Sequence, residues 1–111
     1  MSDEYPTDEQ LDKIKNWDYK LGWKSLIEYV ELIWWMPDWG FKLYKGRDNL
    51  FKNRRVMKLQ LHTGGWSGNE EIIGALQQNF MFWSLSFYKQ IVGGHYWFNL
   101  KSAWLPQKDK T

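Results

Sequence analysis

Cysteine is absent from the 111 residues, and this excludes disulfides, thiolate metal sites and a cysteine nucleophile. Long apolar runs are absent too, because the longest covers only residues 32–36 and is far too short to span a bilayer. The start, residues 1–6, has no basic segment followed by an apolar stretch, so we expect no signal peptide. These absences together favour a soluble, cytoplasmic protein without a membrane partner.

Net charge is also small, at a formal +2 from 15 basic and 13 acidic residues. A balance this close to neutral neither requires nor excludes a nucleic-acid partner. Acidic residues concentrate near the start, whereas residues 45–58 form a basic stretch. We interpret that stretch as a solvated hairpin loop. The alternative is a phosphate-facing patch, in which Lys52, Arg54 and Arg55 would contact nucleic acid.

Aromatic residues are abundant, with nine Trp, six Tyr and six Phe making up 19% of the chain. Aromatic side chains bury large areas, so a short chain can build a core from few positions. They are also frequent anchors in protein interfaces and stacking platforms for nucleic-acid bases. We expect one or two tryptophans to remain outside the core, with Trp39 and Trp66 as the candidates.

The length fits one domain, 1–111, with loose ends at about 1–6 and 106–111. Thr7 and Gln10 have the spacing of a capping box that opens a helix. Apolar residues then recur at helical spacing, and after Gly40 the period changes to two. The expected elements are helices over 7–16 and 24–35, strands over 41–45 and 56–62, a helix over 69–78, and strands over 80–89 and 95–100.

This order, α-α-β-β-α-β-β, predicts an α+β fold in which helices cover one face of a small four-stranded mixed sheet. The strand over 56–62 would connect through the helix over 69–78 to a parallel strand over 80–89, as a β-α-β crossover. Gly93 and Gly94 would then form the turn of a C-terminal hairpin.

Polar and glycine-rich residues collect at one edge of this expected sheet. Ligand sites favour the carboxyl ends of parallel strands, and helix N-termini attract anions. We therefore expect His62 and His95, which are far apart in the sequence, to meet on one rim. The candidate ligand-binding residues are His62, Thr63, Gly64, Gly65, Trp66, Ser67, Gly68, Asn69, Glu70, Gly93, Gly94 and His95.

Several of these residues also have a structural interpretation. The glycines could adopt the positive φ angles of a tight turn, or they could allow the close approach of a ligand. Ser67 with Glu70 three residues later has the spacing of a second capping box. Trp66 could cover the core or offer a stacking surface. The loop lacks the lysine of a P-loop and does not match a dinucleotide-binding glycine pattern.

Catalysis is an open alternative with His62, His95 and Glu70 as the candidate residues. A histidine could act as general base beside the carboxylate, or both histidines with Glu70 could hold a divalent metal. Their spacing is not a recognised metal motif. We therefore expect no cofactor and no metal, and we favour a protein that is not an enzyme.

Three segments, Leu61–Ile73, Phe82–Trp83 and Gly93–Phe98, resemble a set of small proteins of bacteriophages and prophages. Those proteins share an HTGGWSGNE-type loop and a GGHY-type turn. The resemblance implies a viral or prophage origin, action in the bacterial host and a selected role for both glycine-rich segments. The pair Ile91-Val92 stands where a more basic run is typical, and this departure weakens the case for phosphate binding at the turn.

Three functional hypotheses follow. The first is a phage-type accessory protein that docks on a host or defence protein, or captures a small anionic ligand at the glycine-rich loop. The second is a small hydrolase acting on a nucleotide or phosphoester. The third is a nucleic-acid-binding protein that uses the basic stretch 45–58. We favour the first from the sequence, because it requires only an aromatic surface and a shaped polar loop.

Overall fold

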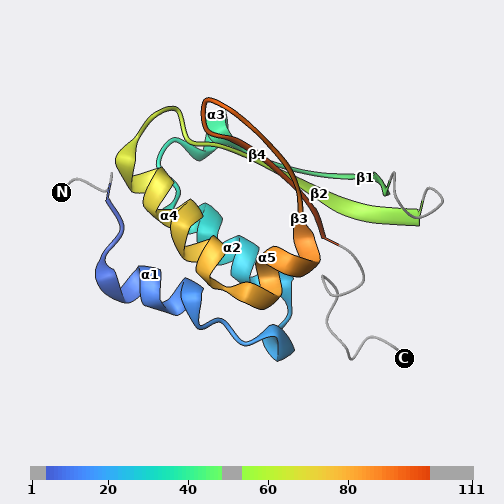
Figure 1. Cartoon of the computed structure of the whole chain (residues 1–111), viewed down its shortest axis with the longest axis horizontal. Helices are drawn as coiled ribbons and strands as arrows, with labels where there is room; N and C mark the ends of the chain where they lie inside the picture. Colours follow the sequence, from blue (N-terminus) through green and yellow to red (C-terminus); the bar gives the residue numbers. More distant parts are fainter. Residues whose placement is uncertain (1–4, 49–53, 101–111) are drawn as a thin grey trace.

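The computed structural model describes residues 5–48 and 54–100, which form a four-stranded sheet with helices packed on one side (Figure 1). The α+β fold and the general order of the elements are confirmed. Of the expected loose ends, only Tyr5 and Pro6 are among the described residues. The elements are α1 (Asp8–Lys15), η1 (Tyr19–Leu21), α2 (Trp23–Ile33), α3 (Pro37–Gly40), β1 (Phe41–Asp48), β2 (Arg54–His62), α4 (Ser67–Gln78), α5 (Phe80–Ser86), β3 (Phe87–Ile91) and β4 (His95–Leu100).

The sheet has the order β1-β2-β4-β3, and every neighbouring pair is antiparallel. The prediction of a mixed sheet is therefore wrong. Strands β2 and β3 do run in the same direction, as the expected crossover requires, but β4 lies between them. The tight turn through Gly93 and Gly94, at φ 107° and 86°, places β4 beside β3, and this hairpin lies with β4 rather than β3 against β2.

Helix α1 begins at the predicted capping box. The Thr7 hydroxyl accepts a hydrogen bond from the Gln10 N–H at 3.1 Å, and the Thr7 N–H donates to Gln10 Oε1 at 2.9 Å. These reciprocal bonds satisfy backbone groups that the first helical turn leaves without partners.

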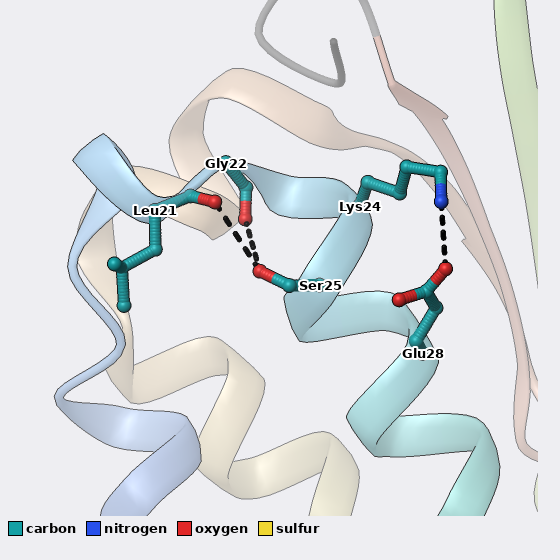
Figure 2. A network of polar contacts seen from close by, with 5 residues as sticks. All are labelled: Leu21, Gly22, Lys24, Ser25 and Glu28. Carbon is teal, nitrogen blue, oxygen red and sulfur yellow. Dashed lines mark hydrogen bonds and ion pairs between the residues drawn. The ribbon is translucent and has the colours of Figure 1, made fainter. Parts of the chain in front are cut away.

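Helix α2 begins after Gly22, whose φ of 86° favours glycine. Figure 2 shows how its first turn is tied down: the Ser25 hydroxyl lies 3.3 Å from the Leu21 carbonyl and 3.2 Å from the Gly22 carbonyl. One turn along the solvent face, Lys24 and Glu28 form an ion pair at 2.8 Å. The start of α2 is thus held by a serine inside the helix rather than by a side chain at its N-cap.

The prediction of a strand over 80–89 is wrong for its first part, because Phe80–Ser86 is helix α5. Asn79 starts this helix: its Oδ1 accepts from the Phe82 N–H at 3.2 Å. Its Nδ2 donates to the Ile14 carbonyl at 2.9 Å, which ties α5 to the end of α1. The alternating pattern was ambiguous, because the same residues place Phe82 and Ser86 together on the buried side of a helical turn.

The core lies between the helices and one face of the sheet. Its residues follow the helical and strand periods expected from the sequence. The helices contribute Leu26, Ile27, Val30, Ile72 and Leu76, and the sheet contributes Leu59, Leu61, Phe98 and Leu100. Within residues 5–48 and 54–100, no helix has the length and apolar character needed to cross a membrane.

Candidate functional site

The end of β2 and the start of β4 bring the two histidines together. His62 and His95 are directly opposite in the antiparallel register, and their Nδ1 atoms lie 2.8 Å apart. The ring centroids are 4.9 Å apart. The expected meeting of both histidines on one rim is confirmed, although by pairing of antiparallel neighbours rather than by a shared carboxyl edge of parallel strands.

A chain of hydrogen bonds runs from this pair across three strands. His62 Nε2 lies 3.2 Å from Gln60 Oε1, and Gln60 Nε2 donates to the Tyr44 hydroxyl at 2.8 Å. An amide oxygen only accepts, so His62 carries its proton on Nε2 and its Nδ1 accepts from the Nδ1–H of His95. The chain therefore has a direction, from β4 through β2 to β1.

The electrostatic surroundings of His62 agree with this assignment. Partial burial of the ring lowers the pKa of His62, and the electrostatic influence of His95 and Lys42 lowers it further. The neutral form is thereby favoured. Neutral His62 has a free lone pair on Nδ1, and this is the acceptor that the bond from His95 requires.

The loop after β2 is a tight turn that depends on two glycines. Gly64 and Gly65 have φ angles of 65° and 79°, and the Trp66 N–H donates to the Thr63 carbonyl at 3.1 Å. The second expected capping box is not formed. Ser67 is already the first residue of α4, and no side chain caps that helix, because the helix begins at the residue that was expected to be its cap.

Asn69 and Thr63 are almost completely buried, with exposed fractions of 1% and 0%. The Asn69 amide spans 34 residues of sequence to reach Trp35: Oδ1 accepts from the Trp35 N–H at 2.9 Å, and Nδ2 donates to its carbonyl at 3.0 Å. The Thr63 N–H donates to the Gly94 carbonyl at 2.9 Å, and a Cβ on Gly94 would collide with the Thr63 hydroxyl. Both residues hold the two glycine-rich segments and the end of α2 in place.

Two tryptophans border the histidines at this rim. Trp39 is 49% exposed, as expected of a tryptophan outside the core, and its ring is edge-on to His62 at 6.3 Å. Trp66 is half-buried and packs against both Trp35 and Trp39. Trp66 thus covers neighbouring rings rather than standing free in a polar loop.

The expected catalytic residues are only partly assembled. Across the described ranges, 5–48 and 54–100, no group of three His, Cys, Asp or Glu side chains could hold a metal. Glu70 lies exposed in the first turn of α4 and does not complete a three-residue ligand set with the histidines. Of the residues expected to contact nucleic acid, Arg54 and Arg55 begin β2, and Lys52 lies outside the described residues.

Sequence reasoning missed a larger feature, the sheet face that the helices leave uncovered (Figure 1). Alternation along β2 sends Leu59 and Leu61 into the core, so Lys58, Gln60 and His62 point to the opposite side. We call this side the open face. The strand register adds residues from the other strands, and the exposed or half-buried residues of the open face are Lys42, Tyr44, Lys58, Gln60, His62, Tyr88, Lys89, Ile91, His95 and Trp97. Val56 and Asn99 lie on the same side of the sheet but are buried.

Lysines and aromatic rings are in direct contact on the open face. Lys89 Nζ lies 4.8 Å from the Trp97 ring centroid, and Lys58 Nζ lies 5.7 Å from that of Tyr88. Tyr44 is 40% exposed. The alternation of Lys, Gln and His with leucines in residues 58–62 was the signal in the sequence that could have revealed this surface.

No protein-family model, no curated protein and no solved structure matches this chain.

Proposed function

We propose that this protein binds nucleic acid through the open face of its sheet. The supporting observation is that charge of opposite sign is carried by different layers. Where side chains are described, the strands carry five basic residues and no acid: Lys42, Lys58 and Lys89 on the open face, and Lys45 and Arg47 at alternate positions of β1. The helices carry eight acids, Asp8, Glu9, Asp12, Glu28, Glu31, Asp38, Glu70 and Glu71, against Lys13, Lys15, Lys20 and Lys24.

A net charge of +2 conceals this separation. An acidic helical layer behind a basic sheet would orient the protein in the field of a polyanion, with the sheet toward the phosphates. The far ends of β1 and β2 project beyond the helices (Figure 1), and this part of β1 carries Lys45 and Arg47. Along β1, residues 42–45 are all exposed, so both sides of that part of the strand are accessible to a ligand.

The proposed nucleic-acid surface includes part of the basic stretch 45–58 and adds the open face of the sheet. The hydrolase hypothesis has less support, because the histidine pair has no carboxylate beside it to complete the expected trio within the described residues. Docking on a host or defence protein would use the same aromatic residues, and it predicts binding that responds little to added salt. Salt dependence therefore distinguishes the two hypotheses.

The test is fluorescence anisotropy with labelled oligonucleotides at increasing KCl. We expect the logarithm of the association constant to fall linearly with the logarithm of the salt concentration. Each lysine that neutralises a phosphate of a single strand adds about 0.7 to the magnitude of this slope. The double variant Lys42→Gln/Lys89→Gln should therefore reduce that magnitude by about 1.4.

The matched control is Lys20→Gln/Lys24→Gln, which removes the same charge from the helical layer. It should leave the slope unchanged. Equal slopes for both double variants would show that the sheet is not the binding surface, and no binding of any oligonucleotide at low salt would exclude the proposed function.

A further inference from the structure

The open face is organised in rows across the strands. In the observed register Lys42 pairs with Gln60, Gln60 with Trp97, and Trp97 with Lys89, so these four residues form one row from β1 to β3. Neighbouring strands lie about 4.8 Å apart, which puts the two lysines about 14 Å apart at the backbone. The row thus has a cation at each margin and a large aromatic ring on an inner strand.

From this row we infer, resting on the proposed function, that the nucleic acid bound here is single-stranded, with a base stacked on Trp97. A single strand offers both of the groups that the row could contact, because its bases are free and its phosphates lie beside them. In a duplex, the base faces are already stacked on one another. Trp97 would then face a groove, with no base surface to cover.

Lys89 is placed so that stacking and phosphate binding reinforce each other. Its ammonium lies over the Trp97 ring at 4.8 Å, and its side chain is exposed. An exposed cation–π contact of this kind is worth about 2- to 5-fold in an equilibrium constant. Stacking of a base on an aromatic ring is worth about 5- to 150-fold. Replacement of the Lys89 ammonium by a base on the Trp97 ring is therefore favourable, because Lys89 then binds a phosphate.

The neighbouring rows would extend the same surface. Tyr44 pairs with Lys58 in the register, and the Lys58 ammonium lies over Tyr88. A second aromatic and cationic set thus lies one row further along the strands. The β4 residue of this second row is Asn99, of which 4% is exposed, so the row offers its aromatic rings at Tyr44 and Tyr88 rather than on β4.

The experiment compares three labelled ligands of equal length at one salt concentration: oligo-dT, a mixed-sequence duplex, and a strand of abasic nucleotides. The abasic strand keeps the phosphates but has no bases. We expect oligo-dT to bind at least about 5-fold more tightly than the abasic strand, and more tightly than the duplex. This comparison uses the unmodified protein and does not depend on any variant folding.

Variants then locate the stacked base. Trp97→Leu should weaken oligo-dT binding by about 5- to 150-fold with an unchanged salt slope, and Trp97→Phe should retain most of the affinity. Phe80→Leu is the matched control, because Phe80 is a 75% exposed aromatic residue on helix α5. Circular dichroism checks that each variant is folded.

Equal affinity for oligo-dT and the abasic strand would overturn the inference, as would duplex binding at least as tight as single-strand binding. Both of those outcomes would leave salt-dependent binding, and hence the proposed function, in place. Failure to bind all three ligands at low salt would overturn both proposals together.

Discussion

The two faces of the sheet are made from alternate residues of the same strands, yet their properties are opposite. In β2, Leu59 and Leu61 are completely buried against the helices, whereas the alternate residues Gln60 and His62 are only half-buried. The buried face contributes most of the strands' share of stability, because apolar burial contributes about 25 cal/mol for each Å² removed from water. The open face contributes little of this apolar burial. Its side chains can therefore suit a binding role with little loss of stability.

The hydrogen bonds differ between the two regions as well. Between α4 and the end of α2, Asn69 uses its amide on the backbone of Trp35 and has 1% of its surface exposed. On the open face, the amide of Gln60 connects Tyr44 and His62 by side-chain bonds at the surface. Substitutions should therefore separate into those that change stability and those that change binding.

The largest expected effect is on the buried face. Leu59→Ala should lower the free energy of unfolding by about 2–5 kcal/mol, because it leaves a cavity in the core. Lys42→Ala on the open face should change it by less than about 0.5 kcal/mol while weakening oligonucleotide binding. Urea denaturation measures the first quantity and anisotropy the second. Equal losses of stability in the two variants would contradict the contrast between the faces.

A smaller effect is expected at Asn69. Asn69→Ala leaves the Trp35 N–H and carbonyl without their side-chain partner and should cost about 1–3 kcal/mol in unfolding free energy. The neighbouring Glu70→Ala is the control, because Glu70 is exposed and should have almost no effect. Oligonucleotide affinity, measured well below the unfolding temperature, should be unchanged in both. A loss of affinity without a loss of stability for Asn69→Ala would instead make this residue part of the binding site.

The smallest expected effect is the pH dependence of stability due to His62. Its pKa is lowered in the folded protein by burial, His95 and Lys42, relative to about 6.5 in the unfolded chain. The unfolded chain therefore binds more protons in this window. The stability contribution is complete above the unfolded pKa and is lost as the pH falls through the lower, folded pKa.

Urea denaturation at about pH 7.5 and at about pH 5, on either side of the unfolded pKa, measures this dependence. The unfolding free energy should be lower at the acidic pH, and His62→Gln should show a smaller decrease than the original protein. An identical decrease in both proteins would assign the pH dependence to other groups.

Local features of the chain were predictable because each depends on a few adjacent residues. The capping box of Thr7 and Gln10, the buried stripe of α2 and the turn at Gly93-Gly94 all follow from short-range geometry. The segment over 80–86 was not predictable in this way. Its apolar residues fit both a strand and a helix. In the structure, Asn79 favours the helix through its local cap on the Phe82 N–H and its bond to the distant Ile14 carbonyl.

By itself, the sequence determined the α+β class, the order of most elements and the core residues, because caps and periodicities act within a few residues. Tertiary structure decided which strand lies beside β2, and hence that His62 meets His95 and that Lys42 and Lys89 flank Trp97. It also decided that basic and acidic residues lie in different layers. These features depend on contacts between residues distant in the chain, and their free energy depends on packing that no short segment contains.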